Sequence, residues 1–117
     1  ALGELCQLIP VCPEQLGGLP TPRLPCEIKC GKVIRKDGED VTDAYRRGAS
    51  ETLRLAKLSV AKKALLKAKS PSCGVRKVYD GSFSGRLTDG DGITAELLAQ
   101  NGIEVFSEDC IGKLLGI

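Results

Sequence analysis

The sequence predicts an α/β fold in which a mostly parallel sheet carries helices on both faces. Three observations support this prediction: short apolar runs alternate with stretches of helical periodicity, glycine and proline gather between them, and the candidate core is aliphatic. Aromatic residues make up only 3% of the 117 residues, and Trp and Met are absent. A chain of this length suits a single core. We therefore expect residues 1–117 to form one domain.

The first third of the chain predicts one buried strand and one hairpin. The apolar run LCQLIPVC, Leu5 to Cys12, has strand length and ends at a proline-marked turn, which suits a buried parallel strand. LGGLPTPRLP then predicts a long loop. CEIKCGKVI, Cys26 to Ile34, alternates weakly in polarity, so we expect a short hairpin or edge segment around Gly31, followed by a polar turn.

A long helix is expected to begin near Thr42 and to continue to Ser59. Either the Thr42 hydroxyl or the Asp40 carboxylate can accept the amide protons of its first turn. Helical spacing places the following apolar residues on one face: Ala44, Tyr45, Ala49, Leu53 and Ala56.

The second half predicts further alternation of strand and helix. Residues 64–68 form an apolar stretch that stops at Ser70-Pro71, and the glycine-rich stretch 79–92 is expected to be mostly loop. ITAELLAQNG predicts a helix with Asp91 as its cap. IEVFS is expected to be a third strand, and EDCIGKLLGI a short terminal helix.

Charge is unevenly distributed along the chain. Between Arg46 and Lys77 there are ten basic residues and one acidic residue, whereas from Asp80 to Asp109 there are seven acidic residues and one basic residue. This pattern indicates either solvated helix faces or a basic surface for an anionic partner such as a nucleic acid. The sequence has no membrane-length apolar run, so we expect a soluble, cytoplasmic protein with no membrane partner.

Two of the six cysteines have the strongest chemical context. Cys12 in PVCPE and Cys73 in SPSCG each come just after an apolar stretch that predicts a strand, and ligands bind at the carboxyl ends of strands in open α/β sheets. Either thiol can instead be a small buried hydrophobe. Cys26 and Cys30, spaced C-x-x-x-C, resemble half of a zinc site, but no histidine and no second pair complete it.

Because the chain has no histidine, any proton transfer must use other side chains. Glu14 is the first candidate because it follows Cys12 in the same loop, although an exposed loop carboxylate is an equal alternative. Ser70 and Ser72 flank Cys73 and are candidates for donating hydrogen bonds to a bound anion or sulfur. Ser70 can equally shape the turn before Pro71.

Six motifs occur in a family order: PVCPEQLGGLPTPR, DGEDVT, SPSCG, YDGSFSG, GDGITAELL and GIEVFSE. Over nearly its whole length the chain resembles the bacterial thiouracil desulfidases, a family first described as a domain of unknown function. The resemblance implies a Rossmann-like three-layer α/β sandwich with a 4Fe-4S cluster held by three cysteines. The open fourth iron takes sulfur from a thiolated pyrimidine such as 2-thiouracil without net redox change.

By the same resemblance, Cys12 and Cys73 are two of the cluster ligands, Glu14 handles protons, and Ser70 or Ser72 orients the substrate. The expected substrate is a thiolated base, a nucleoside or a thiolated tRNA. The family's first cluster cysteine lies in a CLLG-type motif that has no counterpart here. We therefore expect a family domain without its N-terminal strand, or else a third ligand from Cys26 or Cys30. The alternative is a non-catalytic α/β module that binds a small molecule or metal.

Overall fold

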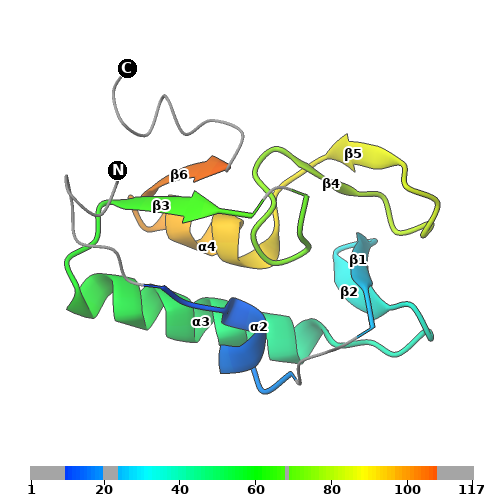
Figure 1. Ribbon diagram of the computed structural model, residues 1–117, viewed down its shortest axis with the longest axis horizontal. Helices are drawn as coiled ribbons and strands as arrows, with labels where there is room; N and C mark the ends of the chain where they lie inside the picture. Colours follow the sequence, from blue (N-terminus) through cyan, green and yellow to red (C-terminus); the bar gives the residue numbers. More distant parts are fainter. Residues whose placement is uncertain (1–9, 20–23, 68, 108–117) are drawn as a thin grey trace.

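The computed structural model describes residues 10–19, 24–67 and 69–107, which form a mixed α/β fold. At its centre lies a parallel pair of strands, β3 (Lys63–Leu66) and β6 (Glu104–Ser107). Two helices, α3 (Thr42–Leu58) and α4 (Ile93–Gln100), pack against each other on the same side of this pair (Figure 1). The expected α/β class and the parallel pairing of these two segments are confirmed.

The core between the parallel strands and the helices is aliphatic, as expected. Ala64 pairs with Val105 and Leu66 with Ser107 in the ladder. Leu66, Ala95, Leu98 and Ile103 are buried together with Cys73, and Leu53 and Ala56 of α3 pack against them. The apolar face predicted for α3 is therefore the face that meets the core.

The hairpin expected around Gly31 is present. Strands β1 (Cys26–Lys29) and β2 (Lys32–Arg35) pair antiparallel, with Ile28 opposite Val33. Both loop residues, Cys30 and Gly31, have positive φ angles of 52° and 77°. This is the backbone geometry of a type I′ turn, which matches the twist of the two strands.

Most of residues 79–92 are loop, as expected, but the ends of this loop form a second hairpin that was not predicted. Strands β4 (Lys77–Tyr79) and β5 (Leu87–Asp89) pair antiparallel, with an ion pair of 2.5 Å between Lys77 Nζ and Asp89 Oδ1. All three residues of β5 are exposed. The sequence could not reveal this strand because it has no buried face and so no alternation of apolar and polar residues.

The start of α3 follows one of the two predicted caps. Asp40 Oδ1 accepts the Thr42 N–H at 2.9 Å, while the Thr42 hydroxyl instead accepts the Val33 N–H at 2.9 Å. The cap expected for α4 is wrong. Gly92 occupies the N-cap position, and Asp91 Oδ1 accepts the Arg76 N–H at 2.7 Å.

Other predictions are corrected or lie outside the described residues. Residues Pro13–Leu16 form one helical turn, α2, where the sequence predicts a proline-marked turn, and only Leu16 belongs to the expected long loop. The predicted strand 5–12 is described only from Pro10 onward, where no strand is present, and the predicted helix 108–117 is not described. Of the three ladders in the described residues, one is parallel, and the described helices α3 and α4 share one side of it. No helix within these described segments combines the length and apolar character needed to cross a membrane.

Candidate functional site

The candidate site lies where two segments distant in sequence come together. One segment is Cys12 with the helical turn α2, which carries Glu14. The other is the loop Ser70–Gly74 between β3 and β4, which carries Cys73. Glu14 and Cys12 lie close enough to Cys73 for their charges to act on its thiol. The segment that carries Cys12 and Glu14 is therefore a neighbour of the Cys73 loop in the fold.

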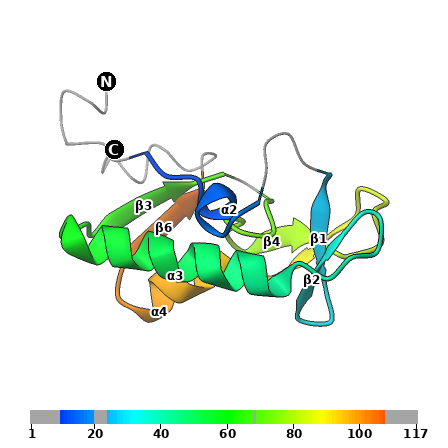
Figure 2. The ribbon, with the colours of Figure 1, turned by 90° about the horizontal axis from the view of Figure 1, so that it is seen from below.

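The position of α2 is fixed by an unusually close contact with α3 (Figure 2). A Cβ atom added at Gly48 would lie 1.9 Å from the Pro13 carbonyl oxygen, and one added at Gly17 would lie 2.0 Å from that of Ala44. Only glycine at both positions allows the two backbones to approach this closely. Arg47 Nη1 also donates a hydrogen bond of 3.0 Å to the Gly17 carbonyl. Backbone contacts with α3 therefore place Cys12 and Glu14.

The loop around Cys73 is shaped by Ser70. The Ser70 Oγ atom accepts the backbone N–H of Ser72 at 3.1 Å and that of Cys73 at 3.2 Å. The Gly74 N–H donates to the Ser70 carbonyl at 2.7 Å. Ser70 therefore has the turn-forming role that the sequence left open, and its hydroxyl proton remains a donor.

The same loop is docked onto the first turn of α4. The Ser72 carbonyl accepts the N–H groups of Thr94 at 2.8 Å and Ala95 at 3.2 Å. A Cβ atom at Gly92 would lie 2.4 Å from the Ser72 carbonyl oxygen, so this contact also requires glycine. The hydroxyls of Ser72 and Thr94 are 2.8 Å apart, and both residues are fully buried, with 0% exposure.

Burial dominates the chemistry of the Cys73 thiol. Its side chain is 8% exposed, and burial raises the pKa of Cys73 to about 11, with smaller upward contributions from the charges of Glu14 and Cys12. Hydrogen bonds with the Ser72 hydroxyl and the Lys67 backbone act in the opposite direction. The metal-free thiol is therefore neutral near pH 7. A thiolate at this position needs a neighbouring positive charge, which a coordinated metal supplies.

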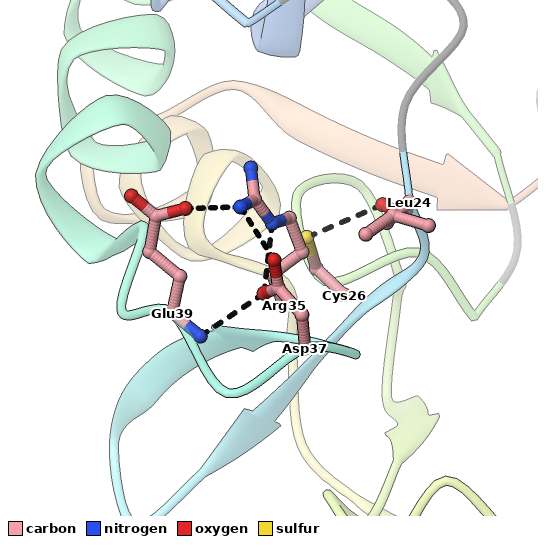
Figure 3. Close-up of polar contacts among 5 residues, drawn as sticks. All are labelled: Leu24, Cys26, Arg35, Asp37 and Glu39. Carbon is pink, nitrogen blue, oxygen red and sulfur yellow. Dashed lines mark hydrogen bonds and ion pairs between the residues drawn. The ribbon is translucent and has the colours of Figure 1, made fainter.

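The other described cysteines lie in different surroundings. Cys26 Sγ faces the Leu24 carbonyl at 3.7 Å, beside Arg35, which pairs with Asp37 and Glu39 (Figure 3). Cys30 is exposed in the turn of the β1–β2 hairpin. Across residues 10–19, 24–67 and 69–107, no three cysteine or acidic side chains are grouped so that they could hold a metal ion. The described residues thus supply no complete set of three ligands.

Sequence reasoning missed three residues near these loops. Gly48 and Thr94 position the two halves of the site, as described above. Glu27 is 8% exposed, and its Oε1 atom accepts the N–H groups of Gly81 at 3.0 Å and Phe83 at 3.1 Å. A carboxylate on the inward face of a short strand was the available signal for Glu27. Glu27 anchors the loop that contains the YDGSFSG motif to the β1–β2 hairpin.

Comparison with known proteins agrees with this geometry. The sequence model of the 2-thiouracil desulfurase family matches residues 1–110. The chain belongs to this family. A relative from the same comparisons, YbbK of Bacillus subtilis (strain 168), an uncharacterized protein, is 45% identical over 114 residues, which cover 89% of this chain and 76% of YbbK.

A solved structure places the chain further within the 2-thiouracil desulfurase family. The 4Fe-4S-dependent thiouracil desulfidase TudS (DUF523Vcz) matches with a TM-score of 0.93 at 44% identity, over 97% of this chain and 76% of that chain. The family resemblance seen in the sequence is confirmed, and this chain is a member of an enzyme family. The cofactor named for TudS is the one that the resemblance implied.

The donor chemistry of this desulfurase-family site suits iron. Thiolates are the usual protein ligands of iron-sulfur clusters. Cys12 and Cys73 lie on two closely docked segments, and the neutral, buried Cys73 thiol becomes a favourable ligand once a metal replaces its proton. The thiol chemistry of these two cysteines is therefore compatible with a cluster.

Proposed function

We propose that the chain is a desulfidase that removes sulfur from a thiolated pyrimidine, with a 4Fe-4S cluster held in part by Cys12 and Cys73. The observation that carries this proposal is the buried Cys73 thiol, with the segment that bears Cys12 and Glu14 near enough for their charges to act on it. Family membership and the likeness to TudS support it. When bound, such a cluster would supply a soft, Lewis-acidic iron for the sulfur of the substrate.

The side chains of this site divide the remaining work. Glu14 is the acid–base group that moves a proton when water replaces sulfur. Ser70 is half-buried and keeps its hydroxyl proton as a donor, whereas Ser72 is fully buried against Thr94. We therefore assign the substrate-orienting hydrogen bond to Ser70 and place Ser72 behind Cys73.

The same proposal extends to the architecture and the compartment. The likeness to TudS over 97% of this chain supports a single domain, and in a Rossmann-like three-layer sandwich the β3–β6 ladder and the α3–α4 pair would be two of the layers. Exposed Cys30 and half-buried Cys12 and Cys26 suit a reducing compartment, which favours the cytoplasm.

A basic rim favours an anionic form of the substrate. Lys67 and Lys69 precede the Cys73 loop, Arg76 follows it, and all three side chains are exposed, whereas the charge of Lys77 is paired with Asp89. Such a rim attracts phosphate groups and therefore favours a thiolated nucleotide or thiolated tRNA over a free base.

The proposal is tested with protein purified without oxygen. We expect about four irons and four sulfides per chain, as in a cubane cluster, and release of sulfide from 2-thiouracil. Thiolated nucleotide and thiolated tRNA are compared at low and high salt. A rate advantage of the anionic substrates that disappears at high salt supports the basic rim, and equal rates overturn it. If the protein holds a cluster but releases sulfide from none of these three substrates, the non-catalytic binding module is the interpretation that remains.

Replacing Glu14 with glutamine tests the acid–base assignment. Glu14→Gln should keep the iron and sulfide content and lower turnover by about a hundredfold or more, because the amide cannot transfer the proton. Glu104→Gln, which changes an exposed carboxylate on β6, is the matched control and should keep full activity. Loss of the cluster together with activity would make Glu14 structural.

A further inference from the structure

We infer that Thr94 is a positioning residue that holds the Ser72 hydroxyl in place for the sulfur of Cys73. This inference rests on the proposed role of Cys73 as a cluster ligand. It concerns a side chain on α4 that does not reach substrate or cluster itself and acts only through Ser72.

The geometry joins three side chains in one chain of hydrogen bonds. Ser72 Oγ lies 2.8 Å from Thr94 Oγ1 and 3.7 Å from Cys73 Sγ. Ser72 and Thr94 have 0% exposure and Cys73 has 8%. Thr94 also donates its backbone N–H to the Ser72 carbonyl at 2.8 Å, so its backbone and its side chain both bind Ser72. The Ser72 hydroxyl therefore has a fixed place beside the sulfur.

This arrangement can supply a hydrogen bond to a ligand sulfur. In the metal-free protein the Cys73 S–H donates to Ser72 Oγ at 3.7 Å. A metal-bound cysteine sulfur only accepts hydrogen bonds, so the Ser72 O–H would then point to the sulfur and the Thr94 O–H would donate to Ser72. The Ser72–Thr94 pair permits this reversal because either oxygen can be the donor.

The consequence concerns the charge on the ligand sulfur. A hydrogen bond to a ligand thiolate stabilises its negative charge and helps to set the reduction potential of an iron-sulfur cluster. In a buried site this bond is stronger than in water. Without the Thr94 hydroxyl, the Ser72 oxygen loses its hydrogen-bond donor. The Ser72 hydroxyl is then free to rotate away from the sulfur, and its hydrogen bond to the sulfur is weakened.

The midpoint potential of the cluster gives the readout, and it is measured together with iron content. Thr94→Val keeps the side-chain shape and removes the hydroxyl. We expect it to retain iron and to shift the potential to a more negative value. Thr94→Ser should restore the wild-type potential. Ser72→Ala should give a shift in the same direction, and the double variant should shift no further than Ser72→Ala alone. An unchanged potential in Thr94→Val, or additive shifts in the double variant, overturns the inference.

A second measurement separates this inference from the proposed function. Absence of a cluster in the wild-type protein under strict anaerobic conditions overturns the cluster assignment alone. Crystal structures of the metal-free wild type and Thr94→Val then test the positioning. A changed Ser72 side-chain rotamer in the variant supports it, and an unchanged rotamer overturns it. If Thr94→Val does not fold, Thr94→Ala is used in both measurements with the same expected outcomes.

Discussion

Replacing Cys73 with alanine is expected to abolish iron retention and sulfide release together, and Cys12→Ala should do the same. Under the proposed assignment the two cysteines are ligands on separately docked segments, so the loss of either would leave the cluster without one of its protein ligands. Iron and sulfide are quantified per chain after anaerobic purification, and sulfide release from 2-thiouracil is measured on the same samples. The expected rate of sulfide release in both variants is that of 2-thiouracil without enzyme.

Two controls make this result specific. Cys30→Ala changes an exposed thiol in the turn of the β1–β2 hairpin and should leave both the cluster and the activity intact. Cys73→Ser, which keeps nearly the same volume, separates loss of a ligand from loss of packing in the buried core. Full activity in Cys12→Ala or Cys73→Ala would contradict the ligand assignment.

Gly48→Ala is expected to cause the second large loss, although Gly48 has no functional group. The added methyl would lie 1.9 Å from the Pro13 carbonyl oxygen, whereas ordinary van der Waals contact begins at 3.4 Å. The methyl carbon and this oxygen must therefore separate by a further 1.5 Å, the difference between 3.4 Å and 1.9 Å. Alanine favours the helical backbone of α3 by about 1 kcal/mol. Forcing the methyl group into this contact would cost about 1–3 kcal/mol, which equals or exceeds the gain in helix propensity. The clash is relieved when α2 moves away from α3.

That movement carries Cys12 and Glu14 away from Cys73. Misplacing reacting groups by about 1 Å lowers rates by about a hundredfold, and we expect kcat/KM to fall by at least this factor. Ser50→Ala, on the exposed side of α3, is the control and should keep wild-type activity. A Gly48→Ala protein with full activity and an unchanged melting temperature would show that α2 is not positioned by this contact.

Much of the fold could be predicted because its segments carry local signals. The long helix α3 shows its apolar face at helical spacing, and Gly31 allows the positive φ that a tight hairpin needs. The β4–β5 hairpin has no such signal, since β5 is exposed along its whole length and is only three residues long. Sheet neighbours also depend on long-range pairing, so the sequence does not show which strands pair; among the described residues, one ladder is parallel and two are antiparallel.

The candidate site was predictable to a different degree. Cys12, Cys73 and Glu14 stand out because reactive residue types lie in proline-containing loops next to apolar runs. Thr94 does not stand out, because a threonine in the first turn of a helix is common, and its partner Ser72 lies 22 positions away. Gly48 likewise acts through a neighbour that only the folded chain provides.

Because the two thiols lie on segments that dock on different helices, cluster binding is linked to the packing of those helices. Cys12 is placed by α3, Cys73 is placed by α4, and the two helices contact each other in the core. Each thiol-bearing segment can dock on its own helix, but the two thiols reach their mutual placement only when the helix pair has formed. Binding of a cluster by both thiols would therefore favour the packed form of α3 and α4, so cluster binding and the packing of this helix pair would be thermodynamically coupled.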